Sequence, residues 1–170
     1  KGFVKNCVLE FVGPGIRNLS MDYRLGIDVM TTETACLSSI WETDELTEQY
    51  FKIHGREEAY KPLHPADPAY YDGAVVIDLS RVEPMIALPF HPSNAYTIRE
   101  VIDNARDILG EVEEAGNRLK GGKKLFRLLD KITPQGIQVS QGIIAGCAGG
   151  TYENVAEAAE ILRGHSCGFD

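Results

Sequence analysis

Residues 142–164 constrain the fold of this chain more than any other part of the sequence. The apolar residues at 139–144 predict a short buried strand that leads into this stretch. Gly149-Gly150 then permits a tight turn, and Thr151 is placed to cap a following helix. The apolar positions that recur at helical spacing after the turn are Val155, Ala158, Ala159 and Leu162. The stretch therefore predicts a strand, a cysteine, a glycine turn and a helix, in that order.

Cys147 lies between the predicted strand and the glycine turn. In α/β folds ligands bind at the carboxyl ends of strands, and the start of a helix favours the thiolate that binds metal or attacks carbon. The alternative is structural, because a cysteine among Ile, Ala and Gly is more often a small buried hydrophobic residue. A phosphate site at Gly149-Gly150 is weakly supported, since neither G-x-x-x-x-G-K-[ST] nor G-x-G-x-x-G occurs.

Strands and helices alternate along the rest of the chain, which predicts an α/β protein. The expected helices have local start signals, because Ser20 and Asp44 are favourable caps and residues 97–100 form a capping box. The expected strands are residues 3–12 and 74–79, and the expected helices begin at residues 21, 45 and 98. Two segments are ambiguous: residues 34–41 fit a strand or a helix, and residues 123–132 fit a short helix or a hairpin.

A segment with three prolines, residues 56–72, is expected to be a surface connection. It is the predicted boundary between two α/β lobes, residues 1–72 and residues 73–170.

The composition excludes several classes of protein. With 44% hydrophobic and 25% charged residues the chain is expected to be globular. The net charge of −8 argues against nucleic acid as a partner. The sequence contains no run of 18 apolar residues that would suggest a membrane span.

The 4 cysteines form no C-x-x-C pair and no signal peptide is visible. We therefore expect reduced thiols in a cytoplasmic protein, or in the mitochondrial matrix if the source is eukaryotic. Because the chain begins at Lys1 without a methionine, we expect a piece of something longer.

Several segments carry motifs of one enzyme family. They are Gly13-Pro14-Gly15 with Ser20, Arg24 and Met30; Met30-Thr31-Thr32-Glu33-Thr34-Ala35; Asp44-Glu45-x-Thr47-x-x-Tyr50; Ile77-Asp78-Leu79-Ser80-x-Val82-Glu83-Pro84-x-Ile86-Ala87-x-Pro89; and Cys147-x-x-x-x-Tyr152-Glu153-Asn154. Together they resemble the aconitase family of iron–sulfur hydro-lyases, which includes homoaconitase and isopropylmalate isomerase. The most specific match is residues 77–89, where a strand pattern runs into an unusual proline-rich crossing.

The resemblance implies an aconitase-like three-layer α/β/α fold, of which this chain would be a fragment of the iron–sulfur half. Cys147 matches the first of three cysteines that hold a [4Fe–4S] cluster, whose open iron binds the substrate as a Lewis acid. Glu33 matches the glutamate of the Met-x-x-Glu motif, which lies near the cluster-bound hydroxyl. The alternative for Glu33 is a carboxylate on a solvated helix end. The first lobe would carry Glu33, and the second would begin the cluster-bearing domain.

The implied parent enzyme dehydrates and rehydrates a hydroxy-tricarboxylic or related acid. Its other two cluster cysteines belong to a downstream C-x-x-C pair, and Cys167, which stands alone, is not assigned as a ligand. We therefore expect the isolated chain to hold no cluster and to be inactive, with the small hydroxy acid and the remaining domains as partners in the parent.

Two departures from the family pattern bear on the substrate. Gly146-Cys147-Ala148-Gly149 replaces the usual Ser-Cys-Thr-Asn, and Val29 replaces an asparagine. Both changes remove polar groups near the cluster or the substrate, so they leave the identity of the acid open.

Two other interpretations of the chain remain from the sequence. The first is an independent α/β module that binds a small anion at Gly149-Gly150, and the second is a structural or interaction domain. His91 near Ser93 also suggests a nucleophilic pair, but no oriented acid is evident. Residues 89–94 are instead expected to form the family's structural crossing.

Overall fold

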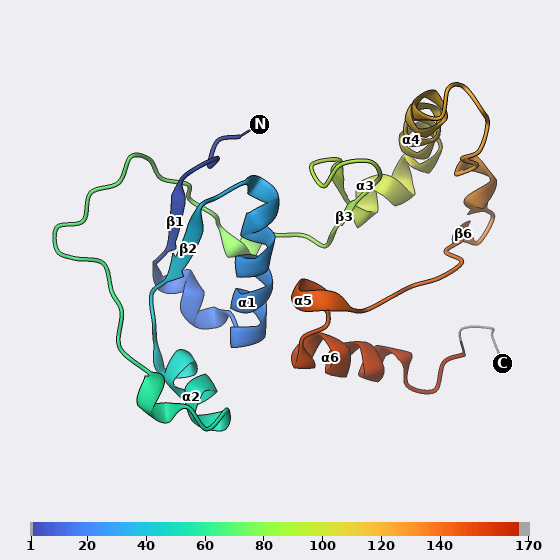
Figure 1. The fold of residues 1–170 in the computed structure, drawn as a ribbon. Helices are drawn as coiled ribbons and strands as arrows, with labels where there is room; N and C mark the ends of the chain where they lie inside the picture. Colours follow the sequence, from blue (N-terminus) through green and yellow to red (C-terminus); the bar gives the residue numbers. More distant parts are fainter. Residues whose placement is uncertain (1, 167–170) are drawn as a thin grey trace. The chain divides into compact units, whose positions relative to one another are not determined.

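The computed structural model describes residues 2–166 (Figure 1). They form two compact units, one of the residues up to Val76 with those from Ile143 onward, the other of Ile77 to Gly142. Among the described helices, none is both long and apolar enough to cross a membrane. Cys167 lies outside the described residues.

The first unit alternates short strands with helices, as predicted for an α/β protein. Its elements are β1 (Val8–Phe11), the 3-10 helix η1 (Pro14–Asn18), α1 (Met21–Met30), η2 (Thr31–Thr34), β2 (Ser38–Trp41), α2 (Glu45–Ile53), η3 (Glu57–Ala59), α5 (Gly146–Gly149) and α6 (Tyr152–Leu162). The strand predicted over residues 3–12 is shorter than expected, because Asn6 has a φ of 62° and interrupts the extended chain before β1.

β1 and β2 pair in parallel, in a register that places Phe11 opposite Trp41. The two rings stack with their centroids 4.2 Å apart. Parallel neighbours need a crossover connection, and α1 provides it (Figure 1). Asp28 fixes α1 to β2, because its carboxylate accepts hydrogen bonds from the Ser39 hydroxyl and, at 3.2 Å, from the Trp41 indole N–H.

The start signals predicted for α1 and α2 are confirmed. The Ser20 hydroxyl accepts a hydrogen bond from the Tyr23 backbone N–H at 3.2 Å, which begins α1. Asp44 and Thr47 form a reciprocal capping box at the start of α2. Both signals depend on residues three positions apart, so the local sequence is enough to define them.

Arg24 is buried in the first unit, with only 2% of its surface exposed. Its guanidinium forms a bidentate pair with Asp44, with N–O distances of 2.9 and 2.6 Å. It also donates to the Ile16 carbonyl at 2.8 Å, to the Leu19 carbonyl at 3.1 Å and to the Thr47 hydroxyl at 3.3 Å. The hydrogen bonds from Arg24 hold the pKa of the Asp44 carboxyl below its ordinary value, against the opposing effect of burial. Arg24 therefore joins η1, α1 and the cap of α2 at one point.

The second unit contains two hairpins and two consecutive helices. Its elements are η4 (Leu79–Arg81), β3 (Met85–Ala87), β4 (Ala95–Thr97), α3 (Ile98–Asp103), α4 (Ala105–Leu119), η5 (Leu129–Lys131), β5 (Ile132–Thr133) and β6 (Gly136–Ile137). The capping box of Thr97 and Glu100 is confirmed. The single helix expected after it is interrupted at Asn104, whose side-chain amide donates to the Glu100 carbonyl at 3.2 Å and competes with the helical pattern.

The core of the second unit lies against α4. Gly116 lets two aromatic rings approach that helix, because a Cβ there would lie 2.6 Å from Phe90 and 2.7 Å from Phe126. The Phe90 and Phe126 rings meet edge to face, with their centroids 5.3 Å apart. The buried apolar side chains of this unit are Val101, Leu109 and Val112.

Two predicted strands are wrong. Residues 74–79 form no strand, and Val76 and Ile77 are 94% and 64% exposed. Residues 139–144 likewise form no strand, and Ile143 is 77% exposed. A strand needs a neighbour to bond its N–H and C=O groups, and no strand among residues 2–166 pairs with either segment. The apolar pattern alone therefore does not make a strand here.

The two units group the chain differently from the two predicted lobes. The first unit's N-terminal part ends at Val76, close to the predicted boundary at 72, but Ile143 and the described residues after it join the first unit. The cause is that α5 and α6 both contact α1. How the units correspond to domains of a longer protein stays a prediction.

Replacing Arg24 by leucine should destabilise the chain strongly, because it would leave the Asp44 carboxylate buried without its partner. The expected loss is about 3–5 kcal/mol of unfolding free energy, measured by urea titration of Trp41 fluorescence. The matched control is Arg163→Leu, which removes an exposed ion pair with Glu160 in the same unit, where the two side chains are 74% and 68% exposed. The control should lose no more than about 1 kcal/mol. Equal losses in the two variants would contradict the role given to Arg24.

The same pair predicts how stability depends on pH. Because the pKa of Asp44 is lowered in the folded chain, the unfolded chain takes up a proton first as the pH falls. The stabilisation is complete above the ordinary carboxyl pKa of about 4 and is lost as the pH falls through the lower folded value. The difference in unfolding free energy between the wild type and Asp44→Asn should therefore shrink toward acid pH. If the difference in unfolding free energy between the two proteins stays constant below about pH 4, the pKa of Asp44 is not lowered by folding.

Candidate functional site

Cys147 lies on α5, a single helical turn, and not at the end of a strand as the sequence predicts. The cysteine is exposed. The turn begins at Gly146, whose φ of 84° lies in the left-handed region that side chains disfavour. It closes at Gly150, where an added Cβ would lie 2.7 Å from the Gly146 carbonyl oxygen. Glycine at these two positions therefore allows the chain to present Cys147 on a tight turn.

The same turn argues against the small-anion module. The Gly150 N–H donates to the Gly146 carbonyl at 2.9 Å, so this amide is already used within the turn. Gly149 lies inside α5, which has 4 residues and is too short to act as an anion site through its helix end.

α5 packs against the middle of α1. The Ala148 carbonyl oxygen would lie 3.2 Å from a Cβ on Gly26, so a side chain at that position would press on α5. Asn154 of α6 donates its amide N–H to the same carbonyl at 3.2 Å. The residue next to Cys147 is therefore held between α1 and α6.

α6 is joined to the start of α1 by three side chains, Ser20, Asp22 and Glu153, here called the interhelix cap. The Glu153 backbone N–H donates to the Asp22 carboxylate at 2.8 Å. The Ser20 hydroxyl donates to the Glu153 carboxylate. Thr151, the predicted cap of α6, makes no capping bond, and its buried hydroxyl has no hydrogen-bond partner in the described part of the chain. Asp22 therefore takes the role predicted for Thr151.

Glu33 lies on η2, the turn that continues from α1, and it is exposed. Side-chain bonds hold this turn, because the Thr31 hydroxyl donates to the Asp28 carbonyl at 2.7 Å and the Thr34 hydroxyl to the Thr31 carbonyl at 2.6 Å. Ala35, with a φ of 60°, ends it. The role of Glu33 as an active-site glutamate stays a prediction.

A hollow of about 520 Å³ lies in the first unit between the segments that carry Glu33 and Cys147. Neither residue lines it, but their chain neighbours Thr34 and Ala148 do. The lining residues are Leu9, Phe11, Asp22, Tyr23, Gly26, Ile27, Met30, Thr31, Thr34, Ala148 and Asn154. The fold therefore brings η2 and α5 to the edge of one largely apolar hollow, although they lie far apart in the sequence.

The metal-binding capacity of the described residues is small. Within residues 2–166, no three His, Cys, Asp or Glu side chains gather closely enough to hold a metal ion. Cys7, Cys36 and Cys147 are free thiols, and a thiolate is the soft ligand that iron–sulfur clusters use. Among the three, the family motif singles out Cys147. A cluster at this position would need further thiolates from beyond the described residues.

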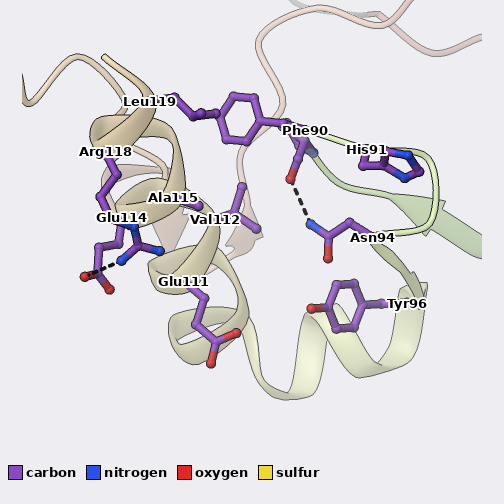
Figure 2. Close-up of a pocket in the computed structure, with 11 residues that line it drawn as sticks. Phe90, His91, Asn94, Tyr96, Glu111, Val112, Glu114, Ala115, Arg118 and Leu119 are labelled. Carbon is purple, nitrogen blue, oxygen red and sulfur yellow. Dashed lines mark hydrogen bonds and ion pairs between the residues drawn. The ribbon is translucent and has the colours of Figure 1, made fainter. Parts of the chain in front are cut away.

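The second unit has a separate surface hollow of about 710 Å³ between the loop before β4 and α4 (Figure 2). Figure 2 shows two pairs of polar groups at its edge. The Asn94 amide donates to the Pro89 carbonyl at 2.8 Å, and Arg118 pairs with Glu114 at 2.7 Å. These bonds fit the structural crossing expected for residues 89–94.

His91 lies in this loop with its Nδ1 atom 2.8 Å from the Ser93 hydroxyl. The same nitrogen accepts the Ser93 backbone N–H at 3.1 Å. Among residues 2–166, no carboxylate is bonded to His91, so the orienting acid of a catalytic triad is not found there.

Cys147 thus lies on a glycine-shaped turn that packs on α1, the helix whose end carries the Met-x-x-Glu motif. The chain belongs to the aconitase family: the model of the aconitase family (aconitate hydratase) matches residues 1–168. The resemblance inferred from the motifs is thereby confirmed.

Similar curated proteins are named as large subunits of 3-isopropylmalate dehydratase. The one from Acetivibrio thermocellus is 32% identical over 156 residues, which cover 92% of this chain and 29% of the relative. Large subunit 2 from Rubrobacter xylanophilus is 31% identical over 163 residues, covering 94% and 30%. The subunit from Campylobacter hominis is 30% identical over 156 residues, covering 92% and 30%. The chain therefore spans about 30% of the length of these relatives.

Replacing Gly150 by alanine should open the Cys147 turn, because the added methyl would meet backbone atoms of Ala145 and Gly146 that cannot rotate away. Overpacking of this kind costs about 1–3 kcal/mol. Hydrogen exchange of the amide at position 150, which is bonded to Gly146 in the wild type, should become faster. The matched control is Gly149→Ala in the same turn, where nothing lies within 4 Å of the added Cβ. Equal exchange in the two variants would show that the close approach at Gly150 does not matter.

Proposed function

We propose that this chain is part of an aconitase-type hydro-lyase and supplies its first cluster thiolate, from Cys147, and an active-site glutamate, Glu33. The parent enzyme would dehydrate and rehydrate a small hydroxy acid. The observation that carries the proposal is the shared hollow, because η2 with Glu33 and α5 with Cys147 both reach its edge. Membership of the aconitase family supports the same assignment.

Cys147 is proposed to hold one iron of a [4Fe–4S] cluster through its sulfur. Its exposure supports this, since a ligand to a shared cluster has to be open toward the segments that bring the other thiolates. When bound, such a cluster supplies a Lewis-acid iron for the hydroxyl and carboxyl groups of the substrate. The chain offers one thiolate to this site, so we propose that the isolated chain holds no cluster and is inactive.

Glu33 is proposed to exchange a proton with the departing hydroxyl group. In the dehydration the C–O bond breaks, the neighbouring C–H bond loses its proton to a base, and its electron pair forms the C=C bond. Water leaves, and no electrons are gained or lost overall. The base is not assigned to any residue of this chain. The exposed position of Glu33 on a fixed turn supports access to substrate.

The substrate is proposed to be a hydroxy-tricarboxylic acid or a related hydroxy acid. Two features favour 3-isopropylmalate as the first acid to test. The first is that the relatives carry the name of a dehydratase for that acid. The largely apolar lining of the hollow is in keeping with an alkyl substituent.

The rest of the proposed enzyme lies in other parts of the parent chain. The parent fold is proposed to be the three-layer α/β/α arrangement of the family, with a first lobe that carries Glu33 and a next domain that Cys147 begins to build. The exposure of the apolar residues Val76 and Ile77 supports this, because such surface is usually covered in a complete fold. A compartment is proposed only from the cysteine usage, which favours the cytoplasm or the mitochondrial matrix.

Cys147→Ser in the full-length parent should abolish or cripple the cluster, because a serine hydroxyl is a poor substitute for a soft thiolate. Iron content, acid-labile sulfide and the visible absorbance of the purified enzyme measure this directly. Cys7→Ser and Cys36→Ser are the matched controls and should leave the cluster intact. Full cluster and full activity in Cys147→Ser would refute the ligand assignment.

Glu33→Gln in the parent should retain the cluster and slow turnover, because the amide cannot exchange a proton with the leaving hydroxyl. The expected loss in kcat is about 10²–10⁴-fold, measured as hydration of the unsaturated acid. Glu10→Gln on β1 is a suitable control for loss of one carboxylate in the same unit. Unchanged turnover in Glu33→Gln would remove Glu33 from the mechanism while leaving Cys147 as a ligand.

A further inference from the structure

We propose that the interhelix cap of Ser20, Asp22 and Glu153 positions Cys147, so that the start of α1 determines where the thiol lies. What Cys147 binds rests on the proposed function, but its position is a property of this chain alone. The three residues are positioning residues, because they act on the thiol through α6 and α5.

The cap first joins the starts of two helices. Asp22 lies in the first turn of α1 and Glu153 in the first turn of α6, where the partial positive charge of each helix end favours a carboxylate. The bonds of Glu153 to Asp22 and Ser20 connect residues 131 and 133 positions apart. Because Thr151 makes no capping bond, the first turn of α6 depends on Asp22 from the other helix.

A hydrogen bond and a peptide link connect the interhelix cap to Cys147. Asn154, next to Glu153, donates to the Ala148 carbonyl at 3.2 Å, and Ala148 follows Cys147 directly. On its other side the same carbonyl rests against α1, where a Cβ on Gly26 would lie 3.2 Å from it. α5 is therefore held from one side by α6 and supported from the other by α1. A metal ligand needs this kind of support, because its geometry is set by the groups behind it.

The test uses the chain with Cys7, Cys36 and Cys167 replaced by serine and a nitroxide spin label on Cys147. Gly26 and its neighbours on α1 should show broadened amide signals in NMR spectra, because the label lies close to them. Asp22→Ala should lose this broadening, and the amides of α6 should exchange about 2- to 30-fold faster, the equivalent of a lost cap of about 0.5–2 kcal/mol. Glu153→Ala keeps the backbone N–H that Asp22 accepts and removes only the bond from Ser20, so it should cause a smaller change in the same direction. Asp22→Asn should restore both, since an amide oxygen also accepts the Glu153 N–H.

The control is Glu157→Ala, an exposed residue one turn further along α6, which should change neither measurement. The Trp41 indole signal reports an intact α1–β2 contact, and if Asp22→Ala loses it, Glu153→Ala on α6 decides the result. Broadening and exchange that stay unchanged in Asp22→Ala, or in Glu153→Ala where that variant decides, would overturn the proposal, and so would a loss that Asp22→Asn fails to restore. Either result leaves the cluster test of Cys147→Ser unaffected, so a failure here is distinct from a failure of the proposed function.

Discussion

The buried pair of Arg24 and Asp44 is the interaction on which the first unit depends. Its five hydrogen bonds reach η1, the end of the loop before α1 and the cap of α2. A buried ion pair is not by itself a strong source of net stability, because desolvating two charges is costly. The pair acts mainly on geometry. All five N–H groups of the planar Arg24 guanidinium have hydrogen-bond acceptors, so α1 is fixed in one orientation relative to η1 and α2.

The orientation of α1 matters because both predicted site segments depend on that helix. η2, which carries Glu33, continues directly from its end, and α5, which carries Cys147, rests on its middle at Gly26. The start of the same helix provides Ser20 and Asp22 to α6. One element of 10 residues therefore relates a carboxylate and a thiol that lie far apart in the sequence. The largely apolar hollow lies along α1, and η2, α5 and α6 each contribute residues to its lining.

The sequence was sufficient for three helix caps that depend on residues a few positions apart. The caps at Ser20, Asp44 and Thr97 are such cases, because a side chain three positions away supplies or accepts the bond. Features that depend on a segment far away in the sequence could not be predicted in this way. The strand pattern at 74–79 and 139–144 forms no strand because a strand exists only beside another, and periodicity does not identify that neighbour.

The same distinction between local and long-range determinants applies to the candidate site. The motifs identified Cys147 and Glu33 as residues of interest, but the positions of their segments follow from contacts that no spacing rule contains. Asp22 replaces Thr151 as the cap of α6 from 131 residues away, and Gly26 matters only because Ala148 approaches it. Thr151 is a residue type favoured at helix caps, but the distant Asp22 makes the capping bond instead.

The first unit is assembled from two stretches of chain that are separated by the whole of the second unit. During synthesis at about 5–20 residues per second, α1 leaves the ribosome several seconds or more before α6 exists. In that interval the flank of α1 that later meets α5 and α6 faces solvent, and closing so long a loop is a late and costly event in folding. The thiol of Cys147 therefore reaches its position on α1 only after the second unit has been made.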